Sequence, residues 1–379
     1  MTLQAHTWKK TGSAAVRVIL PAAALMLFVH EASSAASGIR DGLRVCGELL
    51  IPSVYPMMIL CAFFLRCGAA DGIGRLLAPL MRLLALPDCA GAVLLTALVG
   101  GYPVGARGVQ LLRARDRIDD RQAAHLLHFC VCAGPGFIVN AVGAGLFRSR
   151  TLGMLLFAVQ VVSVLLLGLL SRFIMRLRPP VRHSPAHAAA EPICDALVDA
   201  VTDASASMIA LCAFVLAFSG LLAALSQLTL FRAGVPALLL HLLPEVTAAV
   251  QTAATLRSPV LAAFALGWGG LCVHGQIRVL SGVRGGEFLP FRLLHGLLAA
   301  GLTALLLRLL PHSLDTALPV SASPQLAATA ANGGYSAALL LLVAVFLLSM
   351  PQGRGVRPIP AKTSKKIRKK HSAARENML

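Results

Sequence analysis

Glycine and proline interrupt an apolar stretch at Gly100–Arg107, in the order Gly-Gly-Tyr-Pro-Val-Gly-Ala-Arg. Proline removes a backbone donor and clashes with the preceding turn, while glycine leaves the backbone accessible. Inside a membrane, a helix that restarts at such a break presents an N-terminus that favours an anion. We therefore predict substrate contacts from Gly100, Gly101, Tyr102, Pro103, Gly105 and Arg107. The alternative is a packing kink, with Arg107 reaching the membrane surface.

Two further breaks carry polar residues. Gly134-Pro135-Gly136 interrupts the next apolar stretch and is followed by Asn140. In the second half of the chain, Gly267–Gly270 is a similar break, followed by two polar residues in an apolar run. Polar groups are costly in lipid and commonly mark function, although close helix packing through glycine is the alternative. The residues predicted here to contact substrate are Gly134, Pro135, Asn140, Gly270, His274 and Gln276.

Several acids stand at predicted helix starts. Asp88 and Glu245 each follow a proline, where the free N–H groups and the dipole of a helix stabilise an acid. A functional alternative is an acidic pair that handles protons or cations, and Glu245 is included among the predicted substrate contacts. Asp195, Asp199 and Asp203 share one helix face at a spacing of four, and we predict that they mark its solvated end.

The spacing of His125, His128, Cys130 and Cys132 resembles a metal cluster. A related position in the second half keeps a histidine, His295, without matching cysteines, so we predict packing roles and no bound metal. The sequence contains no Walker loop, GxSxG or HExxH motif, and no carboxylate pair with a base. We therefore predict no enzymatic activity and no cofactor.

The elements that must position these residues are apolar helices. The chain is 57% hydrophobic and 13% charged, which excludes an ordinary soluble enzyme and a disordered chain. We predict an all-α, polytopic helical membrane protein, with about ten or eleven spanning or half-spanning segments. The predicted segments are 14–30, 49–67, 73–86, 90–112, 123–147, 151–175, 206–225, 235–254, 259–280, 288–310 and 335–350. The arginines of 73–86 also fit a helix lying at the membrane surface.

The chain also contains a weak internal repeat. Asp88 in the first half aligns with Glu245 in the second. His128 aligns with His295 in the same order. Transporters are commonly built from two repeats with broken helices and a site between them. The predicted parts are an N-terminal transmembrane helix (1–37), a first repeat (38–175), a cytoplasmic linker (176–195), a second repeat (196–311), a loop and last transmembrane helix (312–350), and a basic cytoplasmic tail (351–379).

The net charge is +18, from 34 Lys+Arg against 16 Asp+Glu. The basic residues collect between apolar runs, which the positive-inside rule explains as cytoplasmic loops and a cytoplasmic tail. We predict that the tail lies on anionic lipid. Nucleic acid is not predicted as a partner, because no aromatic residue interleaves the charges of the tail. At the other end, 14–30 is predicted to remain as a first helix, with a cleaved signal peptide as the alternative.

The motifs Gly101–Ala106, Gly134-Pro135, Glu245–Thr247 and Gly269–Val273 occur in one order. With them, roughly residues 14–350 resemble the sporulation integral membrane protein family of spore-forming bacteria, the YlbJ type. The resemblance implies a nucleoside-recognition (Gate) domain, shared with spore maturation proteins and ferrous-iron transporters, and makes 38–175 a Gate-like membrane domain. The chain departs from the family at Gly100, Ala133 and Ala248-Ala249, where polar residues or Asn-Gly are usual.

The resemblance also implies a function. Such proteins act in endospore formation, in the membrane on the mother-cell side, and are proposed to help move dipicolinic acid towards the spore. Our first hypothesis is a transporter or channel component for a small organic anion, bound between the broken helices of the two repeats. The alternatives are a non-transporting structural or assembly protein and a transporter of nucleosides or ions. Expected partners are the lipid bilayer and other sporulation membrane proteins or further copies of the chain.

Overall fold

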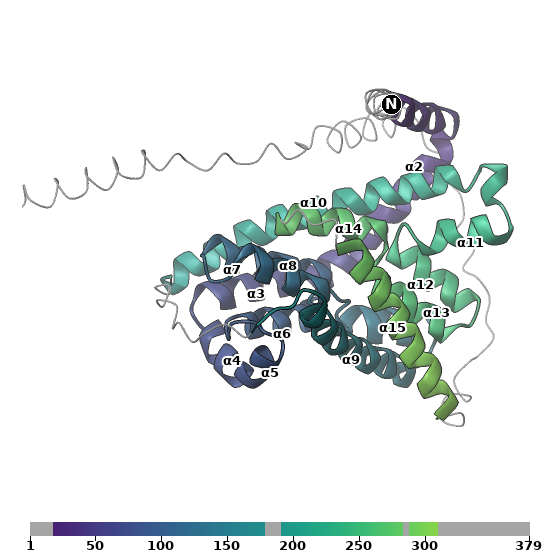
Figure 1. Cartoon of the computed structure of the whole chain (residues 1–379). Coiled ribbons are helices and arrows are strands. Elements are labelled where there is room, and N and C mark those ends of the chain that lie inside the picture. The colour runs from purple at the N-terminus through teal and green to yellow at the C-terminus, as the bar shows by residue number, and fades with distance from the viewer. Residues whose placement is uncertain (1–17, 179–190, 283–287, 310–379) are drawn as a thin grey trace, which may run out of the picture. The chain divides into compact units, whose positions relative to one another are not determined.

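The structure is a computed structural model that describes residues 18–178, 191–282 and 288–309 (Figure 1). These residues fall in one compact unit, Met1–Ala337. A second unit, Ala338–Leu379, lies outside the described residues, and so do most of the predicted linker, the last predicted transmembrane helix and the basic tail. Every regular element in the described part of the chain is a helix, which confirms the all-α prediction.

The first half begins with a bent helical arm and ends with a long straight helix. A helical segment, Val18–His30, meets the helix Ala32–Glu48 at 92°. From there α2 (Ala32–Val45), the π-helix η1 (Cys46–Leu50) and α3 (Ile51–Arg66) follow one another directly. The remaining elements are α4 (Ala70–Leu76), α5 (Ala78–Leu83), α6 (Ala90–Gly100), α7 (Tyr102–Ala114), α8 (Asp120–Phe129), the π-helix η2 (Gly136–Leu146) and α9 (Arg150–Ile174).

The second half consists of α10 (Ile193–Leu225), the 3-10 turn η3 (Thr229–Phe231), α11 (Gly234–Leu242), α12 (Val246–Thr255), α13 (Pro259–Trp268), α14 (Gly270–Ser281) and α15 (Phe288–Leu309). The two halves are interleaved in space. Helix α10 packs against α2 and α3, α14 packs against α7, and α15 packs against α8 and α9 as well as α13.

Four helices of the described chain are long and apolar enough to cross a membrane, and the bent arm with α2 can supply a fifth. The four are Arg150–Ile174, Ile193–Leu225, Pro259–Ser281 and Phe288–Leu309. The chain is therefore a multi-pass membrane protein, as predicted. Several predicted segments are split into shorter helices: 73–86 falls in α4 and α5, 123–147 in α8 and η2, and 235–254 in α11 and α12. The split between α11 and α12 follows from Pro244, which stands just before the residue that caps α12.

The predicted span 90–112 is instead a helical hairpin. The chain turns at Gly101, whose φ of 91° is the left-handed region that favours glycine. A Cβ atom added at Gly105 would lie 3.0 Å from the Cβ atom of Ala97. One added at Gly108 would lie 2.9 Å from a methyl carbon of Val93. Residues so far apart along one helix could not meet, so α7 folds back along α6.

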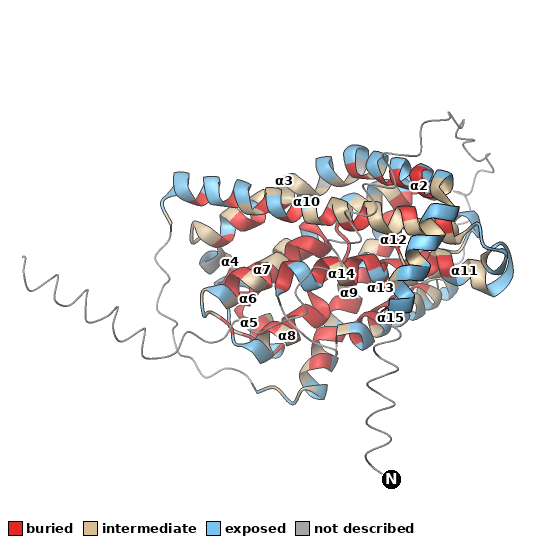
Figure 2. Ribbon diagram, turned by 90° about the horizontal axis from the view of Figure 1, so that it is seen from above, coloured by how far each residue is buried: buried red, intermediate tan, exposed pale blue. Residues whose placement is uncertain are grey.

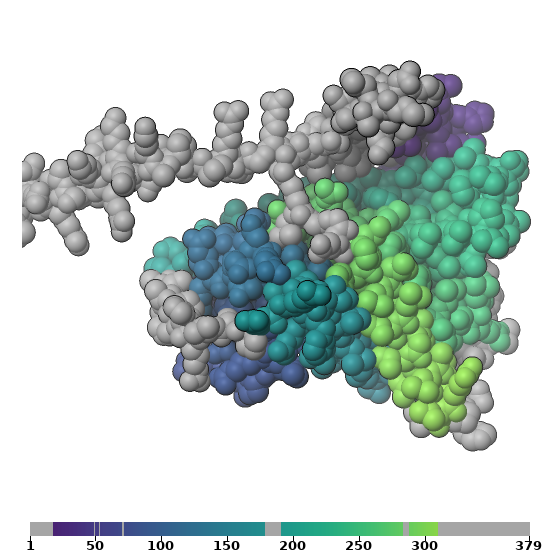
Figure 3. Space-filling view, in the orientation of Figure 1, coloured from purple at the N-terminus to yellow at the C-terminus, as the bar shows by residue number. Residues whose placement is uncertain are grey.

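The core lies around α9 and α14, where Figure 2 shows buried residues gathered. Leu156 of α9, Leu266 of α13 and Phe129 of α8 are fully buried. Outward-facing leucines follow a spacing of four on α15, at Leu289, Leu293 and Leu297. In Figure 3, α15 forms part of the visible surface beside α9. A helix that is apolar on its outer face as well is typical of a membrane span, where lipid covers that face.

Candidate functional site

A cavity of about 350 Å³ lies where the broken helices of both halves meet. Its walls come from the end of η1, α3, the turn between α6 and α7, the start of η2, α10, and the starts of α12 and α14. The wall is mostly apolar, and its volume is in the range of about 300–1,000 Å³ that small-molecule sites occupy. The polar side chains that line it are Tyr102, Glu245, Thr247, Cys272 and Gln276.

The structure brings eight of the thirteen predicted contact residues to this cavity. They are Gly100, Gly101, Tyr102, Pro103, Gly134, Pro135, Glu245 and Gln276. The five that do not line it are Gly105, Arg107, Asn140, Gly270 and His274. The two π-helices, η1 and η2, both reach the cavity wall, and π-helical turns occur frequently at functional sites.

The two breaks of the first half touch each other in the cavity wall. A Cβ atom added at Gly134 would lie 2.7 Å from the carbonyl oxygen of Val99 and 3.2 Å from the amide nitrogen of Gly101. One added at Gly101 would lie 3.3 Å from the nitrogen of Gly134. Only glycine therefore allows the tip of the α6–α7 hairpin to pack against the chain just before η2.

Four helices, α7, η2, α12 and α14, begin at the cavity. The N-terminus of a helix carries a partial positive charge from its unpaired N–H groups. That of α12 is occupied by the chain itself, because an oxygen of Glu245 accepts the backbone N–H of Ala248 at 2.7 Å. Glu245 is buried, so it both caps α12 and places a carboxylate in the cavity wall.

The N-terminus of α14 is occupied by backbone carbonyls. The N–H of Leu271 donates to the carbonyl of Leu243 at 3.0 Å. The N–H of Cys272 donates to the carbonyl of Pro244 at 2.8 Å. The starts of α7 and η2, which are made by the glycine breaks of the first half, carry no side-chain cap. Their first turns are closed by the carbonyls of Gly101 and Gly134. Among the four, these two helix ends are therefore the ones that no side chain and no other segment caps.

The break between α13 and α14 leaves three carbonyls without their usual helical partners. In an unbroken helix, Leu266, Gly267 and Trp268 would accept from the residues four positions later. Those residues begin α14, and two of them bond elsewhere. The hydroxyl of Tyr102 donates to the carbonyl of Leu266 at 2.5 Å. The guanidinium of Arg292 donates to the carbonyls of Gly267 and Trp268. Side chains from α7 and α15 thus satisfy the break.

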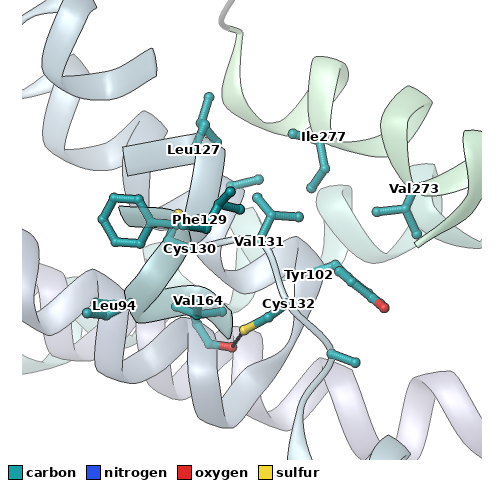
Figure 4. Packing of buried hydrophobic residues seen from close by; sticks show 14 of the residues in the cluster. Leu94, Tyr102, Leu127, Phe129, Cys130, Val131, Cys132, Val164, Val273 and Ile277 are labelled. Carbon is teal, nitrogen blue, oxygen red and sulfur yellow. Dashed lines mark hydrogen bonds between the residues drawn. The ribbon is translucent and has the colours of Figure 1, made fainter. Parts of the chain in front are cut away.

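Arg292 was missed in the sequence analysis. It is fully buried and also donates to the carbonyl of Val131, in the segment before η2. Its guanidinium carbon lies 5.6 Å from the ring centroid of Tyr102. Tyr102 belongs to the buried cluster that also holds Val131, Cys132 and Val273 (Figure 4). The signal was present, because a charged residue inside a predicted span is by itself a functional candidate.

Arg107, which is predicted to contact substrate, does not line this cavity. Its guanidinium lies 2.9 Å from a carboxylate oxygen of Asp203 and donates to the Gln110 side chain at 3.0 Å, away from the main cavity. Asp203 and Asp199 also pair with Arg66. The predicted solvated face of α10 is therefore partly an ion-pair surface, because arginines of α3 and α7 pack against it.

The other four predicted contact residues that do not line the cavity are either buried by packing or exposed. A side chain at Gly105 would overlap the carbonyl of Cys130. Gly270 has a φ of 81°, and a Cβ atom there would lie 2.9 Å from the Cα of Glu245. A ring nitrogen of His274 lies 2.7 Å from the carbonyl of Gly270 in its own helix. Asn140 is exposed on η2.

The histidines of the supposed metal cluster are joined to one serine. His125 and His128 each place a ring nitrogen 2.8 Å from the hydroxyl oxygen of Ser171. The ring of His128 also stacks on Phe291, with centroids 3.8 Å apart. Within residues 18–178, 191–282 and 288–309, no group of three or more His, Cys, Asp or Glu side chains is placed to hold a metal ion.

The fold and the cavity together define a multi-pass helical membrane protein with a small-molecule cavity between broken helices. Comparison with known proteins gives a relative of the same class. Over 143 residues, the chain is 34% identical to the sporulation integral membrane protein YlbJ of Bacillus subtilis (strain 168). The match covers 38% of this chain. The chain thus spans about a third, 35%, of the length of that curated relative. It supports the YlbJ-type resemblance. No protein-family model and no solved structure matches.

Proposed function

We propose that this chain is an integral membrane protein of endospore formation that carries or conducts a small organic anion through its cavity. The name of the related protein supports the part in sporulation. The multi-pass helices and the cavity at their breaks support a carrier or channel component. In this proposal the protein lies in the membrane on the mother-cell side, has its tail in the cytoplasm and has no enzymatic activity.

One observation carries the choice of an anion: the starts of α7 and η2 face a mostly apolar cavity of about 350 Å³. Each helix start contributes roughly half a positive charge. The apolar wall suits a flat organic body, while the helix starts suit its carboxylates. Dipicolinic acid, a small aromatic dianion, has this chemistry and is the candidate substrate that the family resemblance implies.

Glu245 opposes the effect of the helix starts on anion binding. Its buried carboxyl group is the acidic side chain in the wall of this cavity, and in its ionised form it weakens the binding of any anion there. A transport site must bind its solute strongly enough to admit it and weakly enough to release it. We propose that Glu245 supplies this limit while it caps α12.

The test is uptake by the purified protein in liposomes, with labelled dipicolinate and its neutral diamide as a matched pair of equal shape. We expect the diacid to enter faster than the diamide. Glu245→Gln should raise that preference by about tenfold at most, since it removes one buried negative charge. Asp120→Asn is the control and should leave the preference unchanged, because Asp120 is exposed, pairs with Arg113 and does not line the cavity.

Other outcomes would contradict the proposal. Folded protein that moves neither compound would favour the non-transporting role in assembly. Faster entry of a nucleoside or a metal cation than of dipicolinate would favour the third candidate, a transporter of nucleosides or ions.

A further inference from the structure

Arg292 is a full positive charge buried inside the protein. Its side chain is 0% exposed, and in the part of the chain that the structure describes no acidic side chain pairs with it. It is held by carbonyl oxygens instead, from Val131, Gly267 and Trp268. An arginine stays protonated in proteins, so this charge is not removed by loss of a proton.

The charge lies one side chain behind the cavity wall. The guanidinium carbon is 5.6 Å from the centroid of the Tyr102 ring, and Tyr102 lines the cavity. A Cβ atom added at Gly269 would lie 3.3 Å from a terminal nitrogen of Arg292 and 3.5 Å from the Tyr102 ring, so the three are packed closely. Apolar surroundings screen a charge far less than water does. The field of Arg292 therefore extends into the cavity.

The same side chain joins the two halves of the fold. The carbonyl of Val131 belongs to the segment that leads into η2, two residues before the cavity wall at Ala133. The carbonyls of Gly267 and Trp268 end α13. The planar fork of arginine, with five N–H donors, can reach all three at once, which lysine with its compact ammonium group cannot.

We propose that Arg292 is a positioning and selectivity residue of this cavity: it fixes the start of η2 relative to the end of α13, and its charge makes the cavity favour anions. The identity of the solute rests on the proposed function. The sign of the potential in the cavity does not, and it can be measured without any transported substrate.

The measurement uses a cysteine as a probe of charge. Met57 of α3 lines the cavity, so Met57→Cys is made in a chain whose nine native cysteines are replaced by alanine. The rates of its modification by an anionic and a cationic methanethiosulfonate reagent are compared. With Arg292 present we expect the anionic reagent to be favoured. Arg292→Gln should lower the ratio of the two rates by about tenfold, and Arg292→Lys should largely retain it. An unchanged ratio in folded Arg292→Gln protein would overturn the proposal.

A second variant covers the case in which Arg292→Gln does not fold. Cys132 directly follows the carbonyl of Val131 that Arg292 binds. Aspartate at this position places a negative charge beside Arg292 while the arginine stays in place, and asparagine is the neutral control of the same shape. We expect Cys132→Asp to lower the rate ratio relative to Cys132→Asn. Equal ratios in the two variants would contradict the proposal.

The two proposals can fail separately. If the rate ratio depends on Arg292 but wild-type protein takes up no dipicolinate, the proposed transport function fails and the assignment of Arg292 stands. If wild-type protein takes up dipicolinate and the ratio of the two modification rates does not depend on Arg292, only the assignment of Arg292 fails.

Discussion

At the scale of single residues, the break between α13 and α14 shows how a membrane protein keeps a helix interrupted. The carbonyl of Leu266 would be left unpaired in an apolar core without the hydroxyl of Tyr102. An unpaired buried polar group is destabilising by several times the worth of an exposed hydrogen bond. The phenol of Tyr102 is thus required by the backbone of another helix, although its ring lines the cavity.

Tyr102→Phe should therefore lower the stability of the folded protein by about 1–3 kcal/mol, because the ring is kept and one buried carbonyl loses its donor. Thermal unfolding in detergent measures this. Tyr55→Phe is the matched control: Tyr55 bonds the hydroxyl of Ser205, which still has the carbonyl of Val201 as a partner. A loss for Tyr102→Phe no larger than that for Tyr55→Phe would show that the bond to Leu266 contributes little.

The arginines show what residue types alone can and cannot predict. Glycine, proline and one buried acid identified the helix breaks that reach the cavity wall, because their chemistry acts on the local backbone, whereas most of the apolar lining residues were not predicted. Arg107 was assigned to the site on its closeness to a break, yet its charge is paired with Asp203 of a distant helix. Arg292 was not among the predicted site residues. Its carbonyl partners lie in two other segments of the chain. The charge of Arg292 inside a predicted span was visible in the sequence, whereas the partners of both arginines are long-range contacts, which one sequence does not display.

At the scale of elements, the glycine breaks were predictable but their geometry was not. The chain reverses at Gly101, whereas Pro259–Ser281 continues as one 23-residue span through its break at Gly269. Sequence shows that a helix stops, while the packing of the following helix decides its direction. The breaks at Gly101 and Gly269 thus differ in shape, and the internal repeat stays a prediction.

Gly134→Ala tests the contact that places the hairpin tip beside η2. The added methyl group would lie 2.7 Å from the carbonyl oxygen of Val99, and backbone cannot move aside cheaply. We expect a loss of about 1–3 kcal/mol in stability, with reduced uptake of dipicolinate. Gly136→Ala is the control, since Gly136 also lines the cavity but a methyl group there meets nothing within 4 Å. Equal effects of the two substitutions would refute this role of the contact.

At the scale of the whole molecule, an ion-pair network ties α10 to the first half. Asp203 of α10 accepts from both Arg66 of α3 and Arg107 of α7. Glu191, just before α10, pairs with Arg66 and with Arg115 at the end of α7. Helix α10 also supplies Leu211 and Val215 to the cavity wall, so the network fixes one wall of the site against the hairpin that forms another.

Asp203→Asn should loosen this attachment. Asp203 is only 27% exposed and serves two arginines, so removing its charge weakens the pairing of both in a partly buried place. Arg66 keeps Glu191 and Asp199, and Arg107 keeps the Gln110 side chain, so we expect a loss of about 1–2 kcal/mol. Asp120→Asn is the matched control, because Asp120 is 80% exposed and its pair with Arg113 should contribute less than about 1 kcal/mol.

Unfolding by a denaturing detergent at low and high salt measures the stability of both variants. Since salt screens exposed pairs more strongly, the effect of Asp203→Asn should persist at high salt, whereas that of Asp120→Asn should vanish. If the two variants unfold alike, α10 is held by its apolar contacts with α2 and α3, and the ion pairs do not determine the position of the cavity wall.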